Sequence, residues 1–435
     1  MTRWALHHQD IAVPLLPVPA EPGAAGATLT LWLQGVPLGR LDYLAAELPV
    51  ASGALAAAIP RAIAPAVGDR LFGQGFAGRL PIRGPVEEPV PPLGAILAEP
   101  TLLERLRATL ALPAVAPGEG LSVVVCTRDR PEQLERCLAS LDGAAGVAEV
   151  VVVDNGSQGE ATRLVVARHP GVRCLVEPRP GLSLARNTGL AAARQPIIAF
   201  TDDDVVVHAD WAPRLLAAFS APEVMCVTGL VLPTALETEA QLVFERELGG
   251  FGQGLQRMDY DAAFFRRMQR FGAPVWRIGA GANMALRRRA VELVGGFDPR
   301  LGAGAAGCSE DSELWYRLLA AGTTCRYEPA AVVFHEHRRE WQDLQRQMHA
   351  YMRGHVTALL LQYGQHRHAG NLRRLLLSLP RYYAGLVLQG LRHGFRGRYR
   401  LLGPEIGGMA AALPALRLAL AQVPPPRPGA QAALS

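Results

Sequence analysis

Short apolar runs alternate with amphipathic segments over the middle of the chain, beginning at residue 121. Apolar runs of this length, bounded by polar or glycine-rich residues, predict buried strands, and the segments of helical periodicity between them predict helices. The expected strands are 121–126, 149–154, 172–177, 197–200, 223–232 and 324–335, and the expected helices are 131–141, 160–169, 182–194 and 211–219. This alternation predicts an α/β domain with a mostly parallel sheet and helices on both faces.

The two ends of the chain follow other patterns. Residues 28–43 alternate apolar and polar around a glycine, which predicts a hairpin within a small N-terminal accessory domain that is partly β. Proline-rich stretches at 86–92 and 111–120 are typical of linkers. Helical periodicity dominates beyond residue 341. We therefore expect three regions, namely 1–115, 120–340 and 341–435.

Positive charge is concentrated in the last region. The whole chain has 44 basic and 39 acidic residues, but residues 351–435 contain eleven arginines and a single acid, Glu405. Leu, Tyr and Phe interspersed with arginine favour an amphipathic surface that binds an anionic membrane. The alternative is a helical cap that packs on the sheet domain. No nucleic-acid-binding motif or stacking platform is present, so nucleic acid is not an expected partner.

Several residue types exclude other chemistry or indicate a compartment. There is no lysine, which excludes a lysine-containing phosphate loop and a Schiff-base lysine. The six cysteines lack C-x-x-C spacing, which argues against a zinc site and predicts reduced core thiols. Neither a signal-peptide pattern nor an apolar run of 18 residues is found. We expect a cytoplasmic protein, peripheral at the inner face of the cytoplasmic membrane.

Three consecutive carboxylates, Asp202, Asp203 and Asp204, follow the expected strand at 197–200. Open α/β sheets bind ligands just outside the carboxyl ends of their strands. Adjacent carboxylates repel one another, and a hard divalent cation, Mg²⁺ or Mn²⁺, would relieve that repulsion. The alternative is a solvated acidic turn that precedes the helix at Trp211.

Other polar residues are expected at the same edge of the sheet. Thr127 and Arg128 follow the first strand, and Asp154 ends the second. An acid at a strand terminus can bind a ribose or a base edge, although Asp154-Asn155-Gly156 is also a common turn sequence. Arg186 lies one turn into a helix, where its guanidinium could reach an anionic ligand.

Two glycine-rich segments occur further along the chain. Residues 279–284 contain Gly281 and Asn283, and residues 302–307 match G-x-G-x-x-G. No strand precedes the second segment, so the dinucleotide-binding interpretation fails, and a mobile loop beside a site fits better.

Acids and histidines follow these segments. Ser309 is expected to cap a helix whose first turn contains Glu310 and Asp311, which could simply favour the helix dipole. His335 and His337 are two positions apart at the end of a strand and should share a face. His335 could complete a metal site, or it could be structural.

As an ordered set, residues 121 to about 340 resemble the inverting family 2 glycosyltransferases, which have the GT-A fold. The resemblance covers about half the chain and rests on VVVCTRDRPEQLERCLASL, VVVDNGS, RPGLSLARNTGL, IIAFTDDDV, GAGANMALRR, GGFDPRL and SEDSELWYRL. It implies a nucleoside-diphosphate-sugar donor, a divalent metal (Mg²⁺ or Mn²⁺), and a hydroxyl acceptor on a cell-surface glycan, a lipid or a small molecule.

The resemblance also implies roles for single residues. Asp311 would be the catalytic base, with Glu310 as the fallback, and Asp203 would be only a spacer. The remaining roles would be nucleotide binding by Thr127, Arg128, Asp154, Arg186 and Asp202, metal binding by Asp202, Asp204 and His335, and a donor and acceptor pocket at Gly281 and Asn283. Cys126 and Asp129 depart from the Pro and Asn that the family often has.

Two alternatives to a glycosyltransferase remain open. A sugar nucleotidyltransferase would normally carry a basic glycine-rich loop after the first strand, and this sequence has none. A degenerate sugar-binding or scaffold protein would not need the acids at positions 202, 204 and 311.

Overall fold

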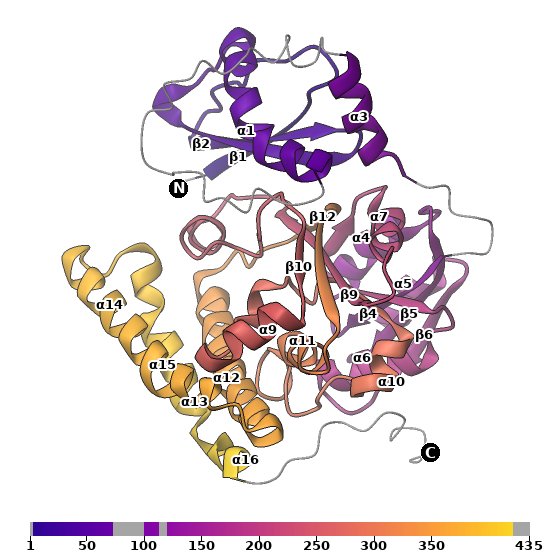
Figure 1. Ribbon diagram of the computed structural model, residues 1–435, viewed down its shortest axis with the longest axis vertical. Helices are drawn as coiled ribbons and strands as arrows, with labels where there is room; N and C mark the ends of the chain where they lie inside the picture. Colours follow the sequence, from indigo (N-terminus) through magenta and orange to yellow (C-terminus); the bar gives the residue numbers. More distant parts are fainter. Residues whose placement is uncertain (1–2, 73–99, 113–119, 421–435) are drawn as a thin grey trace.

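The computed structural model describes residues 3–72, 100–112 and 120–420. Figure 1 shows a central α/β part, an N-terminal unit above it and a group of helices formed by the last part of the chain. The linker predicted at 86–92 lies outside the described residues, as does 113–119 of the second predicted linker. The exact domain boundaries therefore stay a prediction.

All six strands predicted for the middle of the chain belong to one sheet. The strand order is β10-β12-β9-β11-β7-β4-β5-β6, and β8 pairs with β12. The bounds are β4 (Leu121–Thr127), β5 (Val147–Asp154), β6 (Val172–Val176), β7 (Ile197–Asp202), β8 (Val205–Val207), β9 (Val224–Pro233), β10 (Met258–Tyr260), β11 (Asn283–Arg287) and β12 (Thr324–His335).

Strand β11 joins two parallel blocks of the sheet. Strands β6, β5, β4 and β7 are parallel to one another, and so are β9 and β12. Strand β11 lies between β7 and β9 and is antiparallel to both, with Asn283 opposite Thr201 and Met284 opposite Thr228. The local pattern did not predict this strand, because its five residues follow a glycine-rich segment that reads as a loop.

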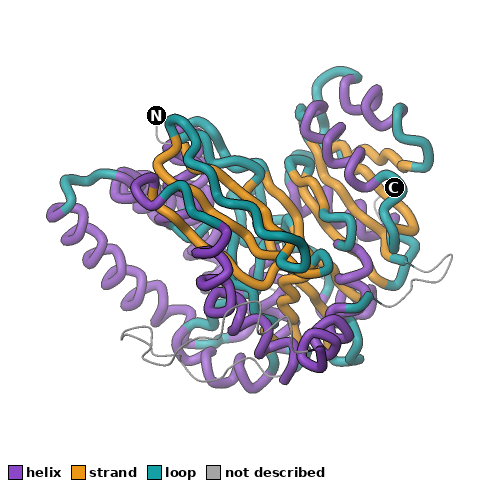
Figure 2. The backbone as a smooth tube through the Cα atoms, turned by 90° about the horizontal axis from the view of Figure 1, so that it is seen from above, coloured by secondary structure: helices purple, strands orange, loops and turns teal. Residues whose placement is uncertain are grey.

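Helices cover both faces of the sheet, as Figure 2 shows from above. Alternate side chains of β4 enter different cores: Val123 and Val125 enter one, and Val124 enters the other. Helices α4 (Pro131–Leu141) and α7 (Trp211–Ala218) cover the first core, and α6 (Leu182–Ala192) and α11 (Glu310–Ala320) cover the second. Shorter helices are α5 (Ala161–Ala167), α8 (Glu239–Leu242), α9 (Ala262–Met268) and α10 (Arg288–Val294).

The N-terminal unit has a sheet of its own. Strands β1 (Arg3–Asp10), β2 (Ala24–Leu33) and β3 (Val36–Leu44) pack against α1 (Ser52–Phe72) and α3 (Pro100–Leu110). The predicted hairpin is formed by β2 and β3, which are joined at Gln34 and Gly35. A buried ion pair between Arg70 of α1 and Glu328 of β12 holds this unit against the large sheet.

The last part of the chain is helical. It contains α12 (Trp341–His366), α13 (Ala369–Arg373), α14 (Leu379–Arg392), α15 (Leu402–Ala411) and α16 (Leu416–Leu420). Residues of α12, α14 and α15 share a small apolar core. None of the helices in the described part of the chain has the length and apolar character that crossing a membrane requires. The predicted α/β class, with a partly β N-terminal unit and a helical C-terminal region, is confirmed.

Candidate active site

One large cavity lies at the edge of the sheet where the parallel strands end. Its volume is about 1400 Å³, more than the roughly 300–1,000 Å³ that is usual for one small ligand. Its walls come from the ends of β4, β7 and β12, from the start of α11, and from α12 and α14. Seven predicted site residues line it, in addition to Glu310 and Asp311: Thr127, Arg128, Arg186, Asp202, Asp204, Gly281 and His335.

The middle acid of the Asp triple is not a spacer, contrary to expectation. Asp203 is buried, accepts a hydrogen bond from the Thr127 hydroxyl at 2.8 Å and forms an ion pair with Arg130 at 3.0 Å. Burial and the neighbouring Asp204 raise the pKa of Asp203 to about 6. Asp203 therefore links the loop after β4 to the end of β7. The Thr127 hydroxyl binds Asp203, although Thr127 also lines the cavity.

Asp204 faces a pair of histidines at the end of β12. Its Oδ1 lies 3.4 Å from Nε2 of His335, and Nδ1 of His335 lies 3.0 Å from Nδ1 of His337, so the two histidines lie side by side as predicted. Burial lowers the pKa of His335, and the nearby Asp204 opposes this effect. The neutral form of an imidazole is the one that binds metals. Burial would raise the pKa of Asp204, but His335, Arg338 and Arg130 together lower it.

The donor atoms of Asp202, Asp204 and His335 fit a hard or borderline divalent cation, because they are carboxylate oxygens and a neutral imidazole nitrogen. Asp202 is about one-third exposed and lines the cavity. Within the described residues, however, no three His, Cys, Asp or Glu side chains already surround a common point. A cation held by these residues would therefore need further oxygens from a ligand such as a diphosphate.

Arg186 connects the two acidic parts of the cavity. Its Nη2 donates to Asp202 at 3.1 Å and its Nη1 donates to Glu310 at 2.6 Å, and its side chain is only 3% exposed. Two protein carboxylates contact this guanidinium, and Arg186 thereby fixes the end of β7 relative to the start of α11. Its expected role in binding nucleotide stays a prediction.

The start of α11 presents two acids to the cavity. Glu310 is buried, and its Oε2 has no hydrogen-bond partner among the described residues. Burial, opposed by Arg186 and reinforced by Asp311, raises the pKa of Glu310 to about 7. Ser309 stands at the predicted N-cap position, but with a φ of 72° its side chain makes no capping hydrogen bond.

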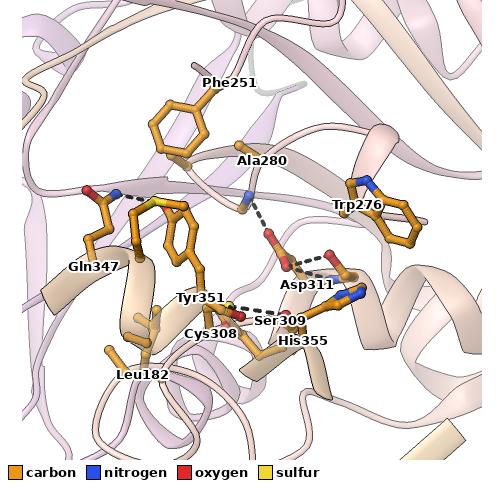
Figure 3. A pocket seen from close by; sticks show the side chains of 18 of the residues that line it. Leu182, Phe251, Trp276, Ala280, Cys308, Ser309, Asp311, Gln347, Tyr351 and His355 are labelled. Carbon is orange, nitrogen blue, oxygen red and sulfur yellow. Dashed lines mark hydrogen bonds between the residues drawn. The ribbon is translucent and has the colours of Figure 1, made fainter. Parts of the chain in front are cut away.

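Asp311 is held by backbone donors at the centre of the cavity wall (Figure 3). Its Oδ2 accepts the N–H of Gly281 at 2.8 Å, and its Oδ1 accepts the N–H of Ser312 at 2.6 Å. A Cβ at Gly281 would lie only 2.8 Å from Nη1 of Arg186 and 3.0 Å from Oδ2 of Asp311, so a larger residue here would displace these two side-chain ends. These two hydrogen bonds fix the orientation of the Asp311 carboxyl group in the cavity wall.

Two predicted site residues lie elsewhere. Asn283, expected in the pocket, is fully buried: its side-chain amide donates to the carbonyls of Leu230 and Ala331 and accepts from Trp211. It therefore fastens β11 within the sheet. Asp154 is also buried, accepts the N–H of Ser157 at 2.8 Å, and is not part of the cavity wall.

The glycine-rich segment 302–307 is a loop beside the site, as expected. The carbonyl of Ala303 accepts the N–H of Leu182 at 2.9 Å, and Gly304 and Gly307 line the cavity. The sequence patterns did not predict the cavity residues that come from distant helices. They include Trp276, Tyr351, His355, Arg374 and Tyr382, which form the far wall.

Part of the sheet domain is similar to a known protein family. Residues 122–295 match the model of Glycosyl transferase family 2. These residues lie within the sheet domain, and the predicted resemblance to family 2 glycosyltransferases is confirmed over them.

Particular relatives are similar over part of their length. A pre-mycofactocin glycosyltransferase of Mycobacterium tuberculosis is 32% identical over 243 residues, which cover 55% of this chain and 48% of that protein. The succinoglycan biosynthesis protein ExoM of Rhizobium meliloti is 30% identical over 49% of this chain and 65% of its own. A crystal structure of glucosyl-3-phosphoglycerate synthase from M. tuberculosis shares 18% identity with a TM-score of 0.40, covering 56% of this chain and 79% of that one. The chain thus spans only part of the length of these curated relatives.

Proposed function

We propose that the protein is an inverting glycosyltransferase that transfers a sugar from a nucleoside-diphosphate donor to an acceptor hydroxyl, with Mg²⁺ or Mn²⁺ as cofactor. One observation carries the proposal. Asp202 and Asp204 at the end of β7 and Asp311 at the start of α11 line a single cavity, and the buried Arg186, which contacts Asp202 and Glu310, joins these two segments.

The acidic residues of the cavity have different roles in the transfer. Asp311 takes the proton of the acceptor hydroxyl, and the N–H groups of Gly281 and Ser312 aim its carboxylate into the cavity. The attack then occurs on one face of the sugar while the diphosphate leaves from the other, which inverts the anomeric centre. Asp202, Asp204 and His335 would hold the divalent cation, whose charge offsets that of the diphosphate when it is bound.

The size of the cavity supports a two-substrate reaction. A volume of about 1400 Å³ is enough for a nucleotide sugar and an acceptor together. The names of the two relatives refer to pre-mycofactocin and to succinoglycan biosynthesis. For this chain we propose a glycan, a lipid-linked or a small-molecule acceptor.

We also propose that the helical C-terminal region rests on an anionic membrane surface, at the cytoplasmic face. Leu388 and Leu391 of α14 are more than 60% exposed, and Phe395 follows them. Exposed apolar side chains flanked by Arg381 and Arg392 suit a surface of anionic headgroups over acyl chains.

Vesicle flotation tests the membrane proposal. The double variant Leu388→Ser/Leu391→Ser should lose binding to vesicles that contain phosphatidylglycerol, whereas Leu164→Ser, an equally exposed leucine on α5, should not. Equal flotation of the two variants would contradict the proposal and favour a helical region that only caps the fold.

A donor panel tests the proposed activity. Purified protein is incubated with nucleoside-diphosphate sugars and Mg²⁺ or Mn²⁺, and NMR records release of the nucleoside diphosphate and the configuration of the product. One donor should be turned over, only with metal, and with inversion. Donor binding without turnover with any acceptor would favour the degenerate binding protein, and formation of a nucleoside triphosphate and a sugar 1-phosphate when pyrophosphate is added would favour a nucleotidyltransferase.

A further inference from the structure

Two arginines on the far wall of the cavity have no acidic partner. Arg374 comes from the segment between α13 and α14, and Arg277 comes from the turn at Val275–Arg277. Both line the cavity. Within residues 3–72, 100–112 and 120–420, neither guanidinium forms an ion pair with a carboxylate. They differ in this respect from Arg130 and Arg186, which bind acids of the protein.

Arg374 is held in place by groups that do not neutralise it. Its guanidinium lies 3.8 Å from the centroid of the Trp276 ring, and its Nε donates to Nε2 of His355 at 3.2 Å. Burial and the charge of Arg374 lower the pKa of His355 to about 3, so this imidazole is neutral and accepts the hydrogen bond. The two terminal nitrogens, Nη1 and Nη2, make no hydrogen bond to any described residue and remain available to a ligand.

The positive charge at this wall is uncompensated. Burial, together with the neighbouring Arg277, lowers the pKa of Arg374 to about 10, so the folded protein holds this cation at a cost. An anion between the two guanidinium groups would remove their mutual repulsion. The paired donors of a guanidinium match the oxygens of a phosphate or carboxylate.

We infer that Arg374 and Arg277 form an anion subsite that binds a phosphate or carboxylate group of the acceptor. The inference rests on the proposed function and specifies its acceptor. Trp276 and His355 lie beside Asp311 in Figure 3, so an acceptor anchored there has its hydroxyl groups near the base. The acids of the opposite wall are left to the donor and its metal.

Calorimetric titration of the full chain with glycerol 3-phosphate, and with glycerol for comparison, tests the subsite. Wild type should bind the phosphate ester and not glycerol. Arg374→Gln should weaken binding by about tenfold or more, because a charge-assisted hydrogen-bond pair is lost. Arg277→Gln should weaken it by a smaller factor. Arg373→Gln, the exposed arginine next in sequence, is the matched control and should bind as wild type does.

A second arm identifies the source of the anion. Vesicles of phosphatidylcholine with and without phosphatidic acid present the same phosphate monoester on a lipid. Binding of glycerol 3-phosphate that depends on Arg374 supports a soluble acceptor. Binding that depends on Arg374 only with phosphatidic acid vesicles supports a lipid headgroup. If Arg374→Gln and Arg277→Gln match Arg373→Gln in both arms, the subsite is refuted.

The test of the anion subsite can be distinguished from the test of the proposed function. Binding of nucleoside diphosphates to wild type reports on the donor side alone. A chain that binds glycerol 3-phosphate through Arg374 but binds no nucleotide would keep the subsite and refute the glycosyltransferase. If Arg374→Gln fails to fold, Arg277→Gln decides, because Arg277 is exposed and has no partner within the described chain to lose.

Discussion

The two walls of the cavity use arginine in opposite ways. On the wall formed by the sheet, Arg130, Arg186 and Arg338 each contact a carboxylate of the protein, and Arg130 and Arg186 contact two each. On the wall formed by the helices, Arg277 and Arg374 contact no carboxylate among the described residues. A paired arginine positions an acid, whereas an unpaired one with free donors is available to an anionic ligand. The first wall thus arranges its own acids, and the second provides charge for a ligand.

This contrast affects the net charge at the acidic edge of the cavity. The Asp triple by itself suggests a strongly negative edge, but three guanidinium groups offset it. A cation that enters at Asp204 therefore competes with Arg130 and Arg338, and its binding should depend on a ligand that brings further negative charge. Metal affinity measured without nucleotide should be weaker than with it.

Replacing the base should have the largest effect. Asp311→Asn keeps the size of the side chain and can still accept one backbone N–H, but it cannot take a proton. We expect transfer to fall by about 10³-fold, with donor binding retained, as measured by initial rates and by nucleotide titration. Loss of donor binding as well would mean that Asp311 belongs to the donor side.

Removing the link between the two acidic parts of the cavity should have the next largest effect. Arg186→Gln leaves Glu310 buried without its counter-charge, and we expect transfer to fall by about 10²-fold and stability by about 3 kcal/mol. Denaturant unfolding and kcat measure the two effects. Arg130→Gln is a useful comparison, since it also loses carboxylate partners but leaves the Glu310 contact intact. Equal kcat values for the two variants would contradict a bridging role.

The raised pKa of Glu310 predicts a smaller, pH-dependent effect. The folded protein holds the Glu310 proton more tightly than the unfolded chain does, because the pKa is about 7 when folded. Stability from this group is therefore full below pH 4.5 and is lost as the pH rises through about 7. Glu310→Gln should flatten the fall in melting temperature over this window. Parallel curves for wild type and variant would show that Glu310 does not titrate there.

The smallest effect is expected at the exposed arginine of the first wall. Arg128 lines the cavity, but its side chain is 49% exposed. Its Nε lies 3.7 Å from Oδ2 of Asp129. Salt and water screen such a charge, so Arg128→Ala should change donor affinity by about threefold or less. Titration at low and high salt checks this. A tenfold loss of donor affinity would mean that Arg128 contacts the diphosphate.

The strands and most acids of the site could be predicted from sequence, because both are local signals. Period-2 and continuous apolar patterns identify strands, and parallel strands bring their carboxyl ends to one edge. The partners of those acids could not be predicted. Arg186 and Glu310 are separated by 124 residues, and Asn283 looked like a pocket residue because nothing local shows that β11 enters the sheet. Arg374 meets Trp276 only through the packing of helices on the sheet domain.

Strand β11 also has a consequence for synthesis of the protein. Strand β7 gains one of its two neighbours only when residues 283–287 arrive, about 80 residues later in the chain. Until then a growing chain exposes the unpaired edge of β7, a row of free N–H and C=O groups that can pair with another chain. Chains cut before residue 283 should therefore aggregate, whereas chains that include β11 have closed this edge. The order in which the ribosome delivers the strands makes completion of the sheet, and of the site at its edge, a late event.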